Sequence, residues 1–313
     1  MKKTVYIYEQ EAVLYKEGPQ LSVRIHKTII YNEPFSNIDS VVIFKRAQIT
    51  TQCLCALLYH GAPIIYTTRS GKIIGSTYPR YTERPLLKLA QYGYLEDQEA
   101  CLNIAKTLIS AKINGQVKTL NVYRNKSASK LKQMAKSVPH STSRNQLLGI
   151  EGSVASVYFS AFAKCLSKLD FTKRETHPAH DPVNALLNLT YMLALYKIDS
   201  ILFAHGFDTT LGFIHTTFRD RISLSLDILE LFRGLLDRFV LKLINLSQIK
   251  EDDFEITENG YLLTKRGFQS YIEKFSDSVD ILETAERVAE RLKRVMLNRG
   301  ENRFDLTELF DML

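Results

Sequence analysis

The sequence predicts an α+β protein in which a small N-terminal β-sheet domain precedes a larger all-α domain. Roughly the first eighty residues fall into short β-branched or aromatic runs that are separated by turn residues. After Pro85 the apolar residues recur instead with the 3.6-residue period of helices. A length of 313 residues suits about two domains. We expect the boundary within Thr82–Pro85, between a domain of residues 1–84 and a domain of residues 85–313.

Short strands are expected first, separated by Glu, Gly-Pro and Asn-Glu-Pro turn signals. They are Val5–Tyr8, Ala12–Tyr15, Leu21–Ile25, Thr28–Tyr31 and Val41–Phe44. A short helix over Thr51–Tyr59 and a hairpin of Pro63–Thr67 with Lys72–Gly75 complete the β domain. The helices expected in the second domain cover residues 86–122, 127–138, 143–169, 182–204, 222–247, 266–275 and 278–297. A final short helix is expected after Gly300–Asn302.

The composition excludes a disordered or fibrous chain, because 45% of the residues are hydrophobic and 24% are charged. No run approaches the ~18 consecutive apolar residues of a membrane span, and Met1–Lys3 leads into no apolar signal core. The four cysteines form no CxxC pair and no zinc spacing, which suits a reducing compartment. We therefore expect a cytoplasmic protein without a membrane segment.

Basic residues are concentrated in one part of the chain. The net charge is +7, yet residues 100–150 contain no Asp or Glu. The same stretch contains nine basic residues: Lys106, Lys112, Lys118, Arg124, Lys126, Lys130, Lys132, Lys136 and Arg144. A block of one sign beside an otherwise balanced chain is typical of a surface that binds a phosphate polymer. The alternative is a solvated basic face without a partner.

Glu151 interrupts the apolar stripe of the helix expected over residues 143–169. It lies four residues after Leu147 and three before Val154, which both belong to the stripe. A carboxylate on a core-facing stripe needs a proton or a positively charged partner, because burying an unpaired charge is costly. Gly149 and Gly152 weaken this helix and indicate that another group approaches the backbone closely. The alternative is a structural salt bridge between Glu151 and a Lys or Arg.

The helix expected over residues 222–247 is apolar on nearly every side except for one narrow polar strip. Asp227 and Glu230 in this strip are three residues apart, so their carboxylates project from one face. The alternative is a solvent-exposed strip in which Glu230 pairs with Arg233. Just upstream, His215 stands alone in an apolar run, where a histidine is more often a hydrogen-bonded core residue than a ligand.

Together, Glu151, His215 and the Asp227–Glu230 pair form an oxygen-rich ligand set with one nitrogen and no cysteine. Such a set suits Mg²⁺ or Mn²⁺ better than structural zinc. Beside a surface that binds nucleic acid, a metal site of this kind typically serves phosphoryl transfer. The metal stabilises charge on the phosphate oxygens and activates a water or a sugar hydroxyl.

Four segments resemble, in order, the motifs of the CRISPR adaptation integrases, the universal core endonucleases that insert new spacers. They are residues 147–155 (LLGIEGSVA), 181–188 (DPVNALLN), 206–215 (GFDTTLGFIH) and 223–233 (SLSLDILELFR). Lys112–Asn114 also stands where that family has a lysine–asparagine helix. The resemblance covers most of the chain, including a β domain before an α domain. Thr209 and Leu231 stand where the family often has proline, which leaves the ligand set intact.

The resemblance implies a metal-dependent DNA endonuclease and integrase. The metal ligands that it carries over are Glu151, His215 and Glu230, with Asp227 as a further catalytic residue that either binds the metal or orients a ligand. The implied reaction is a transesterification with Mg²⁺ or Mn²⁺ as cofactor, in which the 3′-hydroxyl of a short DNA fragment attacks a phosphodiester at the edge of a CRISPR repeat. The residues expected to contact DNA are Lys106, Lys112, Lys118, Arg124, Asn184, Tyr191 and Arg233.

The partners that the resemblance implies are double-stranded DNA fragments, CRISPR repeat DNA, a second copy of the chain bound through the β domain, and a small companion adaptation protein. Two other functions fit the same residues. A structure-selective nuclease for branched DNA would cut junctions but join nothing. A non-catalytic scaffold would bind DNA with structural acids and without a metal.

Overall fold

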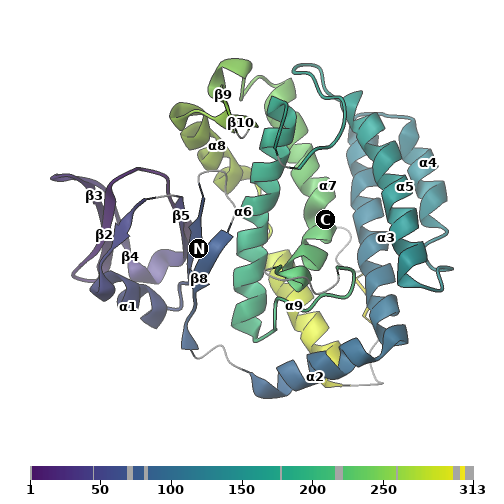
Figure 1. Ribbon diagram of the computed structural model, residues 1–313, viewed down its shortest axis with the longest axis horizontal. Helices are drawn as coiled ribbons and strands as arrows, with labels where there is room; N and C mark the ends of the chain where they lie inside the picture. The colour runs from purple at the N-terminus through teal and green to yellow at the C-terminus, as the bar shows by residue number, and fades with distance from the viewer. Residues whose placement is uncertain are drawn as a thin grey trace. The chain divides into compact units, whose positions relative to one another are not determined.

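The computed structural model describes residues 2–44, 46–68, 73–80, 84–176, 178–215, 221–258, 260–298 and 304–306. The chain divides into two compact units, residues 1–83 and 84–313. The first is rich in strands and the second is mostly helical (Figure 1). The predicted α+β class, with strands before helices, is therefore confirmed.

Within its described residues, the N-terminal unit contains two four-stranded sheets and one α-helix. One sheet has the order β1-β5-β7-β8, in which only β8 runs antiparallel to its neighbour. The other has the order β4-β3-β2-β6 and is antiparallel except where β2 meets β6. The elements are β1 (Lys3–Ile7), β2 (Ala12–Glu17), β3 (Gln20–Ile25), β4 (Thr28–Pro34), a 3₁₀ turn (Phe35–Asn37), β5 (Ile38–Phe44), β6 (Gln48–Ile49), α1 (Thr51–Tyr59), β7 (Ile64–Thr67) and β8 (Ile73–Thr77).

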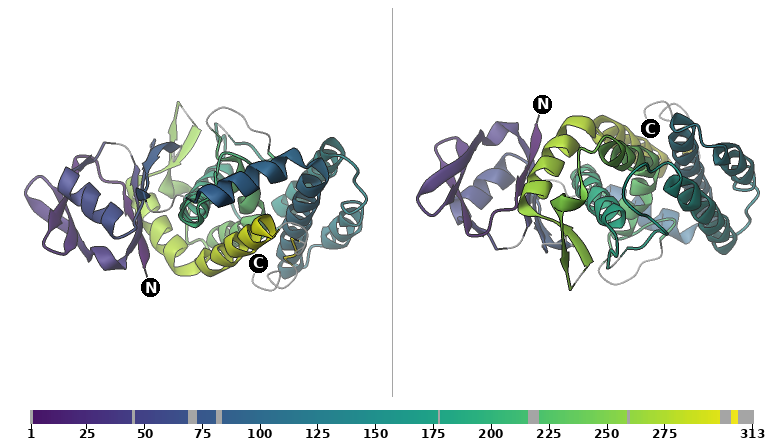
Figure 2. Two further views of the ribbon diagram at one scale, coloured as in Figure 1. Left: turned by 90° about the horizontal axis from the view of Figure 1, so that it is seen from below. Right: turned by 90° about the horizontal axis from the view of Figure 1, so that it is seen from above.

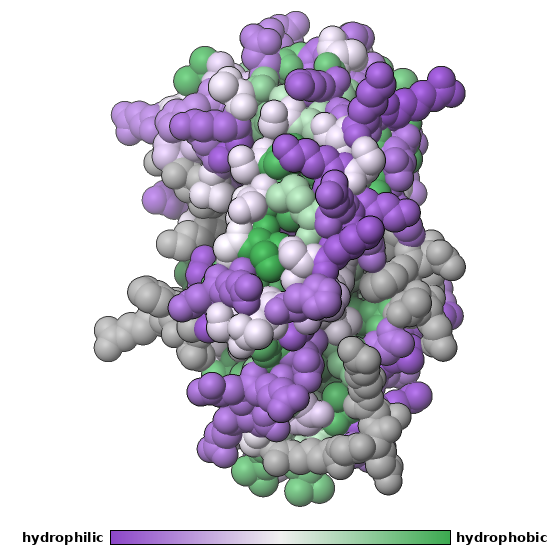
Figure 3. Space-filling view, turned by 90° about the vertical axis from the view of Figure 1, so that its right-hand side faces the viewer, coloured by the Kyte–Doolittle hydropathy of each residue, from purple (hydrophilic) through white to green (hydrophobic). Residues whose placement is uncertain are grey.

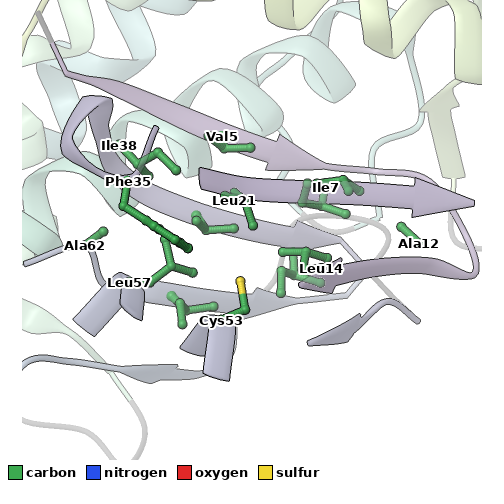
Figure 4. Close-up of a cluster of buried hydrophobic side chains, with 14 residues drawn as sticks. Val5, Ile7, Ala12, Leu14, Leu21, Phe35, Ile38, Cys53, Leu57 and Ala62 are labelled. Atoms are coloured by element: carbon green, nitrogen blue, oxygen red, sulfur yellow. The ribbon is translucent and has the colours of Figure 1, made fainter. Parts of the chain in front are cut away.

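The hydrophobic core of this unit combines residues from both sheets and α1. Alternate residues of β2, among them Leu14, are buried, as the period of two in a strand requires. Figure 4 shows Leu14 and Leu21 beside Phe35 and Leu57, which come from the 3₁₀ turn and from α1. Each predicted strand overlaps an observed one, so the β-branched and aromatic runs with their turn signals located these strands, whereas the two-residue strand β6 was not predicted.

The C-terminal unit is built from helices with one added hairpin. They are α2 (Pro85–Glu96), α3 (Gln98–Val122), α4 (Ser127–Ala135), α5 (Arg144–Ala163), α6 (Pro182–His205), α7 (Ser223–Asn245), a 3₁₀ turn (Glu251–Asp253), β9 (Phe254–Thr257), β10 (Gly260–Leu263), α8 (Lys265–Ser278) and α9 (Leu282–Leu297). The helix expected after Gly300–Asn302 lies outside the described residues, apart from 304–306.

Three sequence predictions for this unit are wrong in detail. The helix expected over residues 143–169 ends at Ala163. The single helix expected over residues 86–122 is two helices, because Asp97 leaves helical geometry. Its carboxylate caps α3 by accepting hydrogen bonds of 3.0 Å from the backbone N–H groups of Glu99 and Ala100. The β9–β10 hairpin was not predicted at all, and its two strands have only four residues each.

Helices α3 and α7 cross at a pair of glycines. A Cβ on Gly234 would lie 2.3 Å from the carbonyl carbon of Gly115, so the backbones approach too closely for a side chain there. Thr119 Oγ1 joins the helices by donating a hydrogen bond of 2.7 Å to Gly234 O. Helix α3 also packs against α4 and α5, and the three lie side by side in Figures 1 and 2. It therefore contacts both α5, which carries Glu151, and α7, which carries Glu230.

Helix α6 is the central apolar helix of this unit. Among the described residues it is the one helix long and apolar enough to cross a bilayer, and 78% of its most apolar window is buried inside the protein. It packs against α7 and α9. This burial identifies it as a core helix, although no segment of this character was expected from the sequence.

Candidate active site

Glu151 lies on α5 at the edge of the core. Ser143 caps this helix, and its hydroxyl accepts a hydrogen bond from the backbone N–H of Gln146. The apolar stripe behind Glu151 is buried, including Leu147 and Val154. The Glu151 side chain retains 25% exposure and forms an ion pair with the ammonium group of Lys112. The structure thus shows the salt bridge that was the alternative interpretation of this residue.

Lys112 bridges two candidate ligands. It projects from α3, is only 7% exposed, and its Nζ lies 2.7 Å from Glu230 Oε2 while it also pairs with Glu151. The sequence predicted that Lys112 contacts DNA from a basic surface. The structure instead places it between two carboxylates, because the glycine crossing brings α3 close to α7.

Glu230 is an ionised carboxylate inside the protein. Its exposure is 2%, and its Oε2 also accepts a hydrogen bond of 2.8 Å from Arg233 Nε. Burial acts to raise the pKa of Glu230, but the positive charges of Arg233 and Lys112 outweigh it and lower the pKa to about 2. The polar strip of α7 is therefore buried, not solvent-exposed, although the expected pairing of Glu230 with Arg233 does occur.

Asp227 holds His215 in place. It is fully buried, and its Oδ1 lies 2.5 Å from His215 Nδ1. The same carboxylate accepts hydrogen bonds from the backbone N–H groups of Phe213 (2.5 Å), Ile214 (2.8 Å) and His215 (3.0 Å). With four hydrogen bonds to one loop, Asp227 is arranged to orient the imidazole, and Nε2 is the ring nitrogen that remains for a ligand.

Two further residues anchor the loop that carries His215, and neither was predicted to belong to the site. Arg144 at the start of α5 donates to Ile214 O, through Nε at 2.6 Å and through a second guanidinium nitrogen. Gln91 on α2 donates from its Nε2 to Asp208 O at 2.8 Å and accepts from Asp208 N. Arg144 was visible in the sequence only as one member of the basic block, and no local pattern marks Gln91.

A buried network also contacts Arg233. The ring of Tyr191 lies under two guanidinium groups, with Arg233 Cζ 4.4 Å and Arg174 Cζ 5.3 Å from its centroid. Asp237, on the polar strip of α7, accepts hydrogen bonds from the hydroxyls of Tyr191 and Tyr158. Burial raises the pKa of Asp237 and also raises the pKa of both tyrosines. Arg174 lies outside the four segments that resemble the family's motifs.

The other residues expected to contact DNA divide into two groups. Asn184 and Tyr191 are buried, and the Asn184 side chain is engaged with Arg174 and Asp181. Lys106 and Lys118 are half-buried on α3, and Arg124 is exposed just after it. The face that carries α3, α4 and α5 shows many hydrophilic side chains, with neutral and hydrophobic ones between them (Figure 3). These three cations remain candidates for phosphate contacts.

The donor chemistry fits a divalent metal ion. Two carboxylates, from Glu151 and Glu230, converge on one cation, the ammonium of Lys112, and His215 is held with one ring nitrogen oriented by a carboxylate. Within the described residues, however, no three His, Cys, Asp or Glu side chains converge closely enough to hold a metal. The set of three ligands therefore stays a prediction.

Comparison with known proteins assigns the family. Residues 5–277 match the model of the family described as CRISPR associated protein Cas1. A CRISPR-associated endonuclease Cas1 from Thermus thermophilus is 30% identical over 273 residues, which cover 86% of this chain and 82% of that protein. A casposase bound to an integration product superposes with a TM-score of 0.87 at 24% identity, over 98% of this chain and 94% of its own. A chain of a Cas6–RT–Cas1–Cas2 complex superposes with a TM-score of 0.82 at 25% identity, and the match covers 97% of this chain and 36% of that chain.

The fold and its relatives define a CRISPR-associated endonuclease, a class that the sequence predicted. The chain belongs to the Cas1 family, since the family model spans most of its length. Nucleases of this family need a divalent metal ion.

Proposed function

We propose that this chain joins short double-stranded DNA fragments to CRISPR repeat DNA, with Mg²⁺ or Mn²⁺ held by Glu151, Glu230 and His215. The observation that carries the proposal is the convergence of the Glu151 and Glu230 carboxylates, from two motif helices, on one cation. The resemblance of the third motif adds His215, whose orientation by Asp227 is typical of a metal-binding histidine. When bound, the metal supplies charge stabilisation at the reacting phosphate.

In the proposed reaction the 3′-oxygen of the fragment attacks a phosphorus atom of the repeat. A new P–O bond forms as the old P–O3′ bond breaks. The attacking hydroxyl releases its proton to solvent, and the leaving 3′-oxygen of the repeat strand takes up a proton from solvent to become a free 3′-hydroxyl. One phosphodiester replaces another, so no nucleotide triphosphate is consumed. The protein positions the reactants, and Asp227 together with Arg144 keeps the His215 loop in place.

Basic residues outside this centre supply the DNA-binding surface in our proposal. Lys106, Lys118 and Arg124 would contact phosphates, which position the duplex without reading its sequence. A second copy of the chain, bound through the β domain, and a small companion protein complete the assembly. The matched Cas6–RT–Cas1–Cas2 complex supports the companion, and light scattering of the full chain with and without DNA tests the dimer.

A strand-transfer assay separates this function from the two alternatives. The substrate is a labelled duplex with free 3′-hydroxyl ends and a plasmid that carries a repeat, and the expected product is labelled plasmid that depends on Mg²⁺ or Mn²⁺. A structure-selective nuclease would cut a branched control without labelling the plasmid. A scaffold would bind both DNAs equally well with and without EDTA and would yield no labelled plasmid.

A further inference from the structure

We propose that Lys112 is an internal counter-ion that competes with the divalent metal for the Glu151–Glu230 carboxylate pair and is displaced when the metal binds. The inference rests on the proposed metal site. It adds a role for a residue that was expected to contact DNA from the surface. Its ammonium makes ion pairs with both carboxylates, and the distance to Glu230 Oε2 is 2.7 Å.

Charge counting favours displacement over coexistence. The two carboxylates of Glu151 and Glu230 already face two cations, Lys112 and Arg233, so this group of four is neutral. Adding a divalent ion with every partner in place would leave two net positive charges in a largely buried cluster. Such an excess is costly in a medium of low dielectric constant. Removing one cation from the carboxylates halves the excess.

Lys112 is better placed to leave than Arg233. The Arg233 guanidinium is held on two sides, by Glu230 Oε2 and by the ring of Tyr191 at 4.4 Å. Lys112 carries a point charge on a flexible four-carbon stem, and one of its partners, Glu151, has 25% of its side chain exposed. A displaced ammonium can therefore reach the open side of the site, where the phosphodiester must enter. A DNA phosphate would then neutralise the released charge.

Metal affinity provides the first test. Mn²⁺ binding is measured by calorimetry on the full chain without DNA, for wild-type protein and for Lys112→Met, Lys112→Arg and Lys242→Met. Lys112→Met should bind Mn²⁺ at least about tenfold more tightly, because a competing cation at ion-pair distance is removed. Lys112→Arg keeps the charge and should not gain affinity. Lys242→Met removes an exposed charge from α7 and should bind like wild type.

Thermal melting adds a readout that is independent of affinity. In EDTA, Lys112→Met should melt below wild type, because Glu151 and Glu230 lose their shared cation. Saturating Mn²⁺ should raise its melting temperature more than that of wild type. If the folded Lys112→Met variant binds Mn²⁺ no more tightly than wild type does, the proposal is overturned.

A chemical measurement on the wild-type protein covers the case in which the Met variant does not fold. Lysine amines are acetylated by an N-hydroxysuccinimide ester, and labelling is read by peptide mass spectrometry in EDTA and in Mn²⁺. Lys112 should be protected in EDTA and become reactive in Mn²⁺, while Lys242 stays constant. Unchanged protection at saturating Mn²⁺ would refute displacement.

Failure of the metal site itself has a different signature. If Glu151→Gln binds Mn²⁺ as tightly as wild type, the carboxylate pair does not hold the metal and the proposed function loses its centre. If Glu151→Gln abolishes binding but Lys112→Met does not strengthen it, the metal site stands and only the counter-ion role of Lys112 falls.

Discussion

Replacing Gly234 by alanine should push α3 away from α7 and misplace Lys112 against Glu230. The added Cβ would lie 2.3 Å from Gly115 C and 2.4 Å from Gly115 O, whereas ordinary contacts are 3.4–4 Å. The helices must therefore separate by about 1 Å, since backbone atoms cannot rotate away. Overpacking of this kind costs about 2 kcal/mol and lowers the Tm by about 4–8 °C in a domain of this size.

The same separation should also affect catalysis, because the crossing lies within about one helical turn of Lys112 and Glu230. A misplacement of about 1 Å reduces the strand-transfer rate by about 10²-fold, with DNA affinity retained. Gly115→Ala is the matched control, because its Cβ would meet Gly234 Cα at an ordinary 3.6 Å. The free energy of unfolding of Gly115→Ala should lie within about 1 kcal/mol of that of wild type. Equal melting temperatures and equal rates for the two variants would refute this account of the crossing.

Three other predictions concern the open side of α5, the charge of Glu230 and the basic surface. A Cβ added at Gly149 or Gly152 meets no atom within 4 Å, so Gly149→Ala and Gly152→Ala should each stabilise α5 by up to about 1 kcal/mol, measured by thermal melting. If DNA approaches this open side of α5, both variants should reduce strand transfer, and unchanged transfer would place the DNA elsewhere. The pKa of Glu230 is lowered from 4.5 to about 2, so the ionised carboxylate stabilises the fold above pH 4.5, and this stabilisation is lost as the pH falls toward 2. In denaturant unfolding at several pH values, this loss should amount to about 3 kcal/mol in the free energy of unfolding of wild type and should be absent in Glu230→Gln. Replacing Lys106, Lys118 and Arg124 by Gln should lower the salt slope of DNA binding by roughly 0.9 for each phosphate that the variant no longer neutralises, and an unchanged slope would exclude these residues from the DNA surface.

Local patterns were sufficient for most elements and for the acids of the site. Runs of β-branched and aromatic residues between turn signals located the strands. The 3.6-residue period marked Glu151 as a carboxylate on a core stripe and Asp227 with Glu230 as a polar strip. These inferences need only neighbours along one strand or helix. The break at Asp97 was missed because the apolar period continues across it, while a single side chain that caps the next helix ends the first one.

The partners of these acids depend on packing between distant segments. Lys112 reaches Glu151 and Glu230 only because Gly115 and Gly234 let α3 and α7 touch, and neither glycine forms a recognisable pair in the sequence. Side chains that bind a loop backbone, such as Arg144 at Ile214 O, leave no periodic signal either. Sequence reasoning therefore named the candidate ligands but assigned Lys112 to the wrong environment.

The most direct test of the central claim is strand transfer by four single variants, measured with Mg²⁺, Mn²⁺ or EDTA and accompanied by thermal melting and DNA binding. Glu151→Ala, His215→Ala and Glu230→Ala should each abolish labelled plasmid product while DNA binding survives. Asp227→Ala should be milder, because Asp227 orients His215 through hydrogen bonds to its ring and its loop. Strand transfer that persists in EDTA, or in folded Glu151→Ala protein, would contradict a metal-dependent integrase centre at these residues.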